Sequence, residues 1–228
     1  FEAALERDEE MGAAYAGLAE VAEENNDSDL QLEYILQALD VTNNSRAARL
    51  DLAYYNIFTA MDFDKGWEIA NQLIAEDETD ASAYIIKAMI HSIEGNNRQA
   101  LIEVDRALDL DHTQIVGYFV KSEALLDSGR YTEAAQTVEQ IWALEPEAYE
   151  VHQQLFFIAL NEEDVAEAER QYYLWLGNKP DFETSYETQA NMELNLGKLD
   201  EAINSFTAGL AEDETDEGLL FGRALAYL

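Results

Sequence analysis

A repeat period of 34 residues is the feature that most constrains the fold of this chain. The hexapeptide AEDETD occurs at 75–80 and again at 211–216, a separation of 136 residues, or four steps of 34. Other residues recur at the same step: Ala100, Ala134, Ala168 and Ala202; Gly95, Gly129 and Gly197, with Glu163 in the gap; and Tyr84, Tyr118 and Tyr186. A fixed period of this length indicates a repeat protein, because each stacked unit reuses the same packing positions.

The period divides all 228 residues into one array. We expect about six full repeats, one of them lengthened to 35 residues by an insertion near Ser45–Arg46, with partial repeats at both ends. The expected boundaries are 1–11 for the end of a repeat, 12–46, 47–80, 81–114, 115–148, 149–182 and 183–216 for full repeats, and 217–228 for the first helix of a further repeat. Because the chain begins and ends inside a repeat, we expect it to be part of a longer array.

Each repeat is expected to form two helices. In the segment 115–146, apolar residues recur at three- and four-residue spacings, as on one face of a helix. Gly129 suits the left-handed residue that closes the first helix, Thr132 is expected to cap the second, and Pro146 to stop it. No segment shows sustained strand alternation, so the sequence predicts an all-α fold.

The repeated AEDETD has two interpretations, an acidic metal site used twice or a capped turn. Both copies cover the end of a second helix and the turn into the next repeat, and Asp80 and Asp216 each stand one residue before a first helix. A carboxylate there accepts hydrogen bonds from free backbone N–H groups and meets the positive end of the helix dipole. The sequence therefore favours the capped turn.

The pattern resembles the tetratricopeptide repeat, a helix–turn–helix unit of 34 residues. Residues that match its motif positions are Tyr15, Tyr84, Tyr118 and Tyr186 for the first aromatic; Ala88, Ser122, Ala190 and Ala224 for the small residue of the first helix; the four alanines above and Val104, Val138, Tyr172 and Phe206 for the second helix; and Pro146 and Pro180 for the terminal proline. The segment FEAALER at the N-terminus matches the end of a second helix. The match is looser over 12–80, where Gln31 and Gly66 replace the alanine and Tyr54 replaces the small residue.

The resemblance implies a right-handed α-solenoid in which the first helix of each repeat lines a concave groove. The residues that would face this groove are Tyr55, Phe58, Ile85, Met89, Phe119, Glu123, Asp127, Gln153, Phe157, Glu187 and Asn191. Apolar side chains bordered by carboxylates and amides suit a peptide or helix with apolar anchors and basic flanks. The alternative is that several of these aromatic residues only pack between adjacent helices.

Composition excludes several other classes of protein. The net charge of −35 opposes binding to nucleic acid or to an anionic membrane surface, and the absence of cysteine excludes disulfides, thiolate metal sites and a cysteine nucleophile. We find no signal-peptide pattern and no apolar run as long as a membrane span. We expect a cytoplasmic location, although the chain opens at Phe1 rather than at a methionine.

No residue pattern predicts a catalytic, cofactor or metal site. His91 and His152 fall at positions that pack inside a repeat, and His112 falls where other repeats carry proline. The stretch DFDKGWE at 62–68 does not match a calcium loop, because Trp67 stands where the loop needs glycine and Leu73 where it needs the closing glutamate. Lys87, Lys121 and Arg223 recur in phase, and we expect their charges to pair with neighbouring acids.

These observations predict a protein-interaction scaffold that binds a protein or peptide ligand and has no catalytic activity. The main alternative is a regulatory arm of a larger enzyme or transcription regulator whose other domain lies outside this sequence. A third interpretation is weak self-association through the solenoid ends. A fourth is that the acidity reflects a salty cell interior rather than the charge of a partner.

Overall fold

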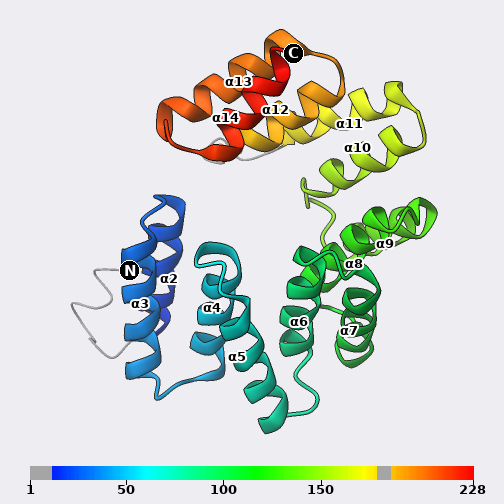
Figure 1. Cartoon of the computed structure of the whole chain (residues 1–228). Coiled ribbons are helices and arrows are strands. Elements are labelled where there is room, and N and C mark those ends of the chain that lie inside the picture. The colour runs from blue at the N-terminus through cyan, green and yellow to red at the C-terminus, as the bar shows by residue number, and fades with distance from the viewer. Residues whose placement is uncertain (1–11, 179–185) are drawn as a thin grey trace. The chain divides into compact units, whose positions relative to one another are not determined.

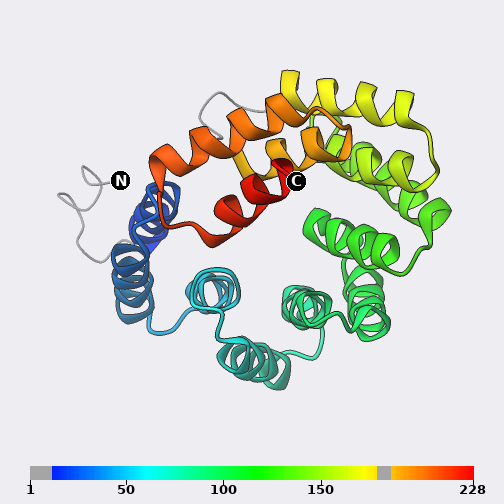
Figure 2. The same ribbon diagram turned by 45° about the horizontal axis from the view of Figure 1, so that its top comes forward.

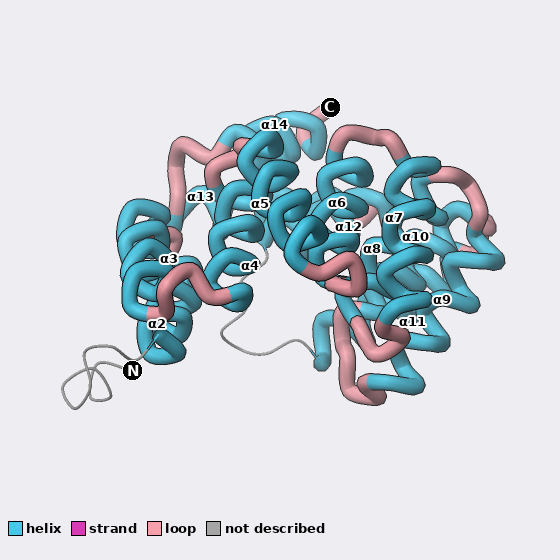
Figure 3. The backbone as a smooth tube through the Cα atoms, turned by 90° about the horizontal axis from the view of Figure 1, so that it is seen from below, coloured by secondary structure: helices cyan, strands magenta, loops and turns pink. Residues whose placement is uncertain are grey.

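The computed structural model describes residues 12–178 and 186–228, and in these ranges the backbone forms helices joined by turns, without a strand (Figure 1, Figure 3). The predicted all-α fold is therefore confirmed. The repeat end expected at 1–11 and the helix stop expected at Pro180 lie outside the described residues.

The chain divides into two compact units, residues 1–124 and 125–228, and each is described by itself. The first unit contains α2 (Gly12–Glu24), α3 (Ser28–Val41), α4 (Arg46–Tyr54), η1 (Tyr55–Thr59), α5 (Phe63–Glu76), α6 (Ala81–Ile93), α7 (Asn97–Leu110) and most of α8 (Ile115–Asp127). The second unit contains α9 (Tyr131–Leu144), α10 (Val151–Asn161), α11 (Val165–Asn178), α12 (Tyr186–Asn195), α13 (Leu199–Glu212) and α14 (Glu217–Ala226).

Consecutive helices pack as hairpins within each unit. In the first unit α2 packs on α3, α4 on α5 and α6 on α7, while α4 also contacts α2 and α6. Figure 2 shows α4, α5 and α6 nearly end-on, with α5 to one side of the line that joins α4 and α6. The first helices of neighbouring hairpins therefore form one layer, and their second helices form another. In the second unit α10 packs on α11 and α12 on α13, and α14 contacts both α12 and α13.

A left-handed residue closes the first helix of each hairpin. At Gly129 φ is 71°, its N–H bonds to the carbonyl of Leu126, and the N–H of Arg130 bonds to the carbonyl of Leu125. This pair of bonds is the Schellman arrangement, which glycine forms most easily because it has no Cβ. The same arrangement recurs at Asn26, Gly95, Glu163 and Gly197, all with positive φ. The closing role expected for Gly129 is confirmed.

The hairpin of α4 and α5 departs from this pattern. Its first helix ends in the π-helical turn η1, in which the N–H of Ala60 bonds to the carbonyl of Tyr55, five residues before it. The left-handed residue is then Met61, with φ of 53°. A π turn contains one residue more than an α turn, so it shifts the residues that follow around the helix axis.

Small residues at the motif positions let the helices of each unit approach closely. Ala88, Ala100, Ala134, Ala168, Ala190 and Ala202 are all fully buried. Large side chains such as Tyr84, Phe156, Trp175 and Phe206 fill the remaining space. Gly66 fits the same logic, because a Cβ added there would lie 3.1 Å from side-chain atoms of both Ile57 and Ile90. The core of each unit is therefore a series of local clusters, such as the one that joins α6 and α7 to α8.

One expected cap is wrong. Thr132 does not cap the second helix of its hairpin, because α9 begins at Tyr131 and its N-cap is Arg130, whose side chain makes no capping hydrogen bond. The Schellman turn places the chain directly into the next helix after Gly129, so Thr132 already lies in the first turn of α9.

Candidate partner-binding surface

The acidic hexapeptide forms a capped turn in both of its copies. Oδ1 of Asp80 accepts the N–H of Ala83, and Oδ1 of Asp216 accepts the N–H of Leu219, so both residues cap the helices that follow. Three residues earlier, Asp77 accepts both the hydroxyl and the N–H of Thr79, and these two bonds lower the pKa of its carboxyl group. Asp213 and Thr215 repeat this arrangement. The caps predicted at Asp80 and Asp216 are confirmed.

The predicted groove residues of the first unit differ in exposure. Phe58 is 54% exposed, and its ring stacks on Tyr54 with the centroids 6.4 Å apart. Tyr55 and Phe119 are half-buried, and Glu123 is exposed. Ile85 and Met89 are only 1% and 8% exposed, because they pack in the core between α6, α7 and α8. A partner on this face would therefore contact Phe58 and Tyr55 rather than the two aliphatic side chains of α6.

The predicted groove residues of the second unit are mostly polar. Asp127 and Glu187 are exposed, and Gln153 and Asn191 are half-buried. Phe157 is also half-buried, with its ring edge-on to the buried ring of Phe156 at a centroid distance of 5.1 Å. Within this unit the residues lie on α8, α10 and α12, the first helices of their hairpins.

Lysines on the first helices bind to carboxylates of the second helices. Nζ of Lys87 on α6 lies 3.1 Å from Glu103 on α7 and also over the ring of Trp67, 5.1 Å from its centroid. Nζ of Lys121 on α8 lies 2.7 Å from Asp105 on α7. The pairing expected for these two lysines is confirmed. Their positive charges are compensated inside the hairpin stack, so the exposed charges of the predicted groove set are negative.

The histidines have structural surroundings. Nδ1 of His152 is 2.7 Å from Oε1 of Gln171, and its ring contacts that of Trp142. His91 is half-buried with its ring against Trp67, at a centroid distance of 5.0 Å. His112 is exposed in a turn. In the described ranges no group of three or more histidine, aspartate or glutamate residues is arranged to hold a metal ion.

The stretch that faintly resembled a calcium loop begins a helix. Oδ1 of Asp62 accepts the N–H of Lys65 and caps α5, and its Oδ2 lies 2.8 Å from Nζ of the same lysine. The hydrogen bonds with Lys65 lower the pKa of Asp62. Asp62 therefore serves as an N-cap, in the same way as Asp27 at the start of α3.

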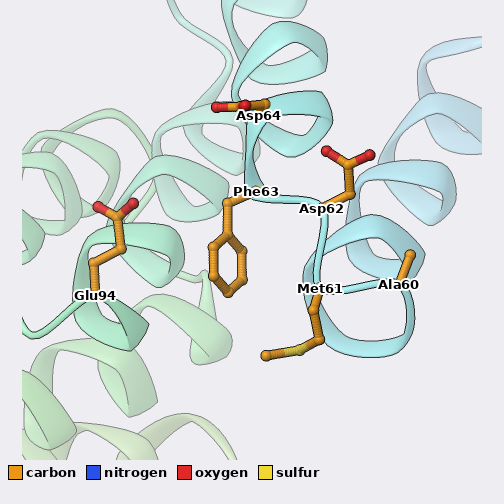
Figure 4. A pocket seen from close by; sticks show the side chains of 6 residues that line it. All are labelled: Ala60, Met61, Asp62, Phe63, Asp64 and Glu94. Carbon is orange, nitrogen blue, oxygen red and sulfur yellow. The ribbon is translucent and has the colours of Figure 1, made fainter.

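The residues around Met61 form a site that the sequence did not predict. Ala60, Met61, Asp62, Phe63, Asp64 and Glu94 line an open hollow of about 470 Å³ between the turn of one hairpin and the end of α6 (Figure 4). Met61 stands 34 residues before Gly95, in the row that continues with Gly129 and Gly197. A large apolar residue in a glycine row was the signal that could have identified this site.

Comparison with known proteins agrees with the repeat geometry. Residues 125–186 match the profile of the tetratricopeptide repeat. This segment is therefore identified as tetratricopeptide repeat sequence, in agreement with the repeat period of the chain. A comparison with curated protein sequences gives no match. None of the helices within the described ranges combines the length and the hydropathy needed to cross a membrane.

Several solved structures share the fold, and two of them are tetratricopeptide repeat proteins. A protein from Parabacteroides merdae aligns with 100% of this chain and 90% of its own, at 12% identity and a TM-score of 0.71. A thermophilic protein from Thermus thermophilus aligns with 80% of this chain and 99% of its own, at 19% identity and a TM-score of 0.67. The Cut9–Hcn1 hetero-tetramer of the APC/C aligns over 98% of this chain and 44% of the other, at 19% identity and a TM-score of 0.72. At these identities the likeness concerns the fold.

Proposed function

We propose that this tetratricopeptide repeat chain is a protein-interaction scaffold that binds a peptide or helical segment with apolar anchors and basic flanks. The family match over residues 125–186 and the shared fold support a scaffold in general. The specific preference rests on one observation, the capture of the first-helix lysines by second-helix carboxylates. The exposed carboxylates of the predicted groove set, Glu123, Asp127 and Glu187, lie on first helices.

The exposed aromatic surface supports an apolar anchor in the ligand. Phe58 on η1 gives the first unit an exposed ring, and Tyr55 in the first unit and Phe157 in the second are half-buried rings. Aromatic side chains are frequent energetic centres of interfaces because they bury a large area at low cost in side-chain entropy. A basic flank would be attracted by the net charge of −35, which speeds encounter and favours basic over acidic partners.

The experiment selects peptides from a random display library on the full chain and measures their affinity for two charge-reversed variants. One variant carries Glu123→Lys, Asp127→Lys and Glu187→Lys on first helices. The matched control carries Asp109→Lys, Glu139→Lys and Glu145→Lys, which lie on or just after second helices and change the net charge by the same amount. Single substitutions then assign any loss to one unit or the other.

We expect the selected peptides to combine an apolar residue with lysine or arginine. The first-helix variant should bind them at least about tenfold more weakly and with a smaller dependence on salt, because local ion pairs are lost. The control should change affinity by less than about threefold. Equal losses in the two variants would show that only the long-range field attracts these peptides, and the surface assignment would be wrong.

A further inference from the structure

Met61 occupies a backbone conformation that favours glycine and yet exposes its side chain. Its φ is 53°, and its side chain is 60% exposed to solvent. The residues one, two and four repeats later, at 95, 129 and 197, are glycines with φ between 71° and 74°. A left-handed residue with a long side chain is disfavoured relative to glycine, and an exposed methionine contributes little burial in return. The folded chain alone therefore gives no reason for methionine at this position.

The π-helical turn is the second unusual feature of this hairpin. It ends at Thr59, two residues before Met61, and the N–H of Asp62 then bonds to the carbonyl of Asn56. Asn56 is itself buried and donates to the carbonyl of Leu52, so the turn is held from within. Single π turns are frequent at functional sites, because the extra residue changes the direction of the side chains that follow. Two departures from the repeat pattern thus meet at one place.

Two large apolar side chains, Met61 and Phe63, lie among the acidic residues of the hollow next to this turn. Figure 4 shows the Phe63 ring and the Met61 side chain pointing into the space between the turn and the end of α6. Phe63 is half-buried, because its ring also packs against the core cluster of α4, α5 and α6. The ring is therefore held in place from behind, while methionine is the adaptable part of the surface. We call this site, lined by residues 60–64 and Glu94, the Met61 hollow.

The charges at the edge of the Met61 hollow are negative. Asp62, Asp64 and Glu94 line it, and its lining contains no lysine or arginine. The carboxylate of Asp62 is compensated by Lys65. Glu94 accepts a hydrogen bond from the neutral amide of Asn96 and lies 3.9 Å from Nδ1 of His91, and no ion pair of Asp64 is found in the described ranges. Neither Asp64 nor Glu94 is paired with a lysine or arginine in the described ranges, and Figure 4 shows them on the side of α5 and on the end of α6.

We propose that the Met61 hollow docks a segment of a partner protein in which one apolar side chain is flanked by lysine or arginine. The apolar side chain contacts Met61 and Phe63, and the basic flanks pair with Asp64 and Glu94. Charge complementarity selects this occupant over a second copy of the chain, since two copies with net charges of −35 repel each other. This site lies on the turn between α4 and α5 and not on the first-helix face proposed above, so each proposal can fail alone.

The four methionines of the chain allow a direct test. The full chain is labelled with ¹³C at the methionine methyl groups, and the Met61 resonance is assigned as the one absent from Met61→Gly. The probes are arrays of nine-residue peptides in which one Leu, Met, Phe or Trp stands among Arg and Ser residues. Matched peptides carry Ala at the anchor or Glu in place of Arg. Met89 and Met192, with 8% and 0% exposure, report on changes elsewhere in the fold.

The expected result is a saturable shift of the Met61 resonance with at least one Arg-flanked apolar peptide, while the Met89 and Met192 resonances stay in place. That peptide should bind about tenfold more tightly than its Ala-anchored match, as one buried apolar side chain can supply. The Asp64→Asn/Glu94→Gln variant should weaken it further, and Glu33→Gln/Asp109→Asn, with the same change in charge, should not. Met61→Gly should abolish the preference for the apolar anchor while its thermal unfolding midpoint stays equal or rises.

Four results would overturn the proposal. The first is the absence of any shift of the Met61 resonance with the peptides of the arrays. The second is equal binding of the apolar and the Ala-anchored peptides. The third is a Met61 shift that follows protein concentration without peptide, which would identify a second copy as the occupant. The fourth is a clear fall in the unfolding midpoint of Met61→Gly, because methionine would then be present for stability rather than for binding.

Discussion

Arg46 and Asp80 stand one repeat apart in the sequence and form a two-pronged ion pair in the structure. Nε of Arg46 lies 2.6 Å from Oδ2 of Asp80, and Nη2 lies 2.7 Å from Oδ1. The arginine begins α4, and the aspartate caps α6. The pair therefore fixes the spacing between the first helices of two neighbouring hairpins in the first unit. The side chain of Asp80 is only 3% exposed, so its charge depends on this partner.

Substitution of Asp80 by asparagine should separate the ion pair from the cap. Asparagine caps helices as well as aspartate does, so Asp80→Asn keeps the bond to Ala83 and loses the charge that Arg46 requires. We expect a loss of about 1–3 kcal/mol in unfolding free energy, because a buried charged hydrogen bond is broken. Asp216→Asn, at a cap for which no ion pair is found among the described residues, should lose less than about 0.5 kcal/mol. Urea unfolding followed by circular dichroism measures the free energy of unfolding of both variants. Equal losses in the two variants would show that the ion pair with Arg46 adds no stability.

Asp111 should make the fold sensitive to acid over a defined range of pH. Hydrogen bonds from the Thr113 hydroxyl, the Gln114 amide and the Thr113 N–H lower the pKa of Asp111 to about 2. A carboxyl group with a depressed pKa stabilises the folded state above its unfolded pKa of about 3.9, and this contribution is lost as the pH falls toward 2.

The comparison of the wild type with Asp111→Asn isolates this effect. The wild type should unfold at a higher temperature than the variant above pH 4, and the difference should shrink toward zero near pH 2. Asp109→Asn, a change at an exposed side chain two residues away, should give a difference that does not follow this curve. A constant difference between pH 5 and pH 2 for Asp111→Asn would contradict the assignment.

Glu193 ties three helices of the second unit together. Its carboxylate is buried and accepts the hydroxyl of Tyr172 on α11 at 2.6 Å, the hydroxyl of Ser205 on α13 at 2.7 Å, and the amide of Gln189 on α12 at 3.0 Å. Burial, together with the bond to Glu193, raises the pKa of Tyr172, so its hydroxyl stays protonated as a donor.

Removal of this acceptor should be costly. Glu193→Ala leaves buried hydroxyl donors unpaired, and we expect a loss of about 3 kcal/mol in unfolding free energy. Glu193→Gln keeps one acceptor oxygen and should lose less. Chemical denaturation of both variants and of Tyr172→Phe, arranged as a double-mutant cycle, measures the coupling. A loss below about 1 kcal/mol for Glu193→Ala would mean that water replaces the carboxylate without penalty.

Glu163 is the residue at which a simple substitution should stabilise the fold. It holds φ of 62° in the row otherwise occupied by Gly95, Gly129 and Gly197, and its side chain is exposed. Glu163→Gly should raise the unfolding free energy by about 0.5–1 kcal/mol, since relief of the left-handed strain exceeds the added entropy of the unfolded chain. Gly197→Ala is the mirror control and should lower it, because no atom lies within 4 Å of the added Cβ and only the backbone is affected. Thermal unfolding of both variants measures these changes. A lower unfolding midpoint for Glu163→Gly than for the wild type would contradict the prediction.

Local backbone chemistry explains why much of the fold was predictable. Asp80 and Asp216 cap helices because a carboxylate before a helix meets unpaired N–H groups whatever surrounds it. The glycine row marks the left-handed turns for the same local reason. Thr132 was placed wrongly because the sequence alone does not fix a helix start to one residue, and the hydrogen bonds of the Gly129 turn place it two residues earlier than expected.

The candidate surface was less predictable than the fold. Helical spacing places Ile85 and Met89 on the first-helix face with Phe58, but α7 and α8 cover the two aliphatic side chains and leave Phe58 open. Glu193 stands in a row with Ile57, Leu125 and Ala159, which are buried and apolar, and with His91, which is half-buried; a carboxylate in this row signals a polar network. The sequence could show that signal, but it could not name Tyr172 and Ser205 as the donors.

The order of residues by itself determined that this chain forms paired helices at a step of 34, with their caps and turns, because those features depend on contacts within a few residues along the backbone. Only the packing of one hairpin on the next decided which side chains remain in water, that Arg46 reaches Asp80, and that Met61 stands at the edge of an open hollow. Exposure depends on the distance and angle between helices, and these follow from the combined volumes of many side chains rather than from any single position.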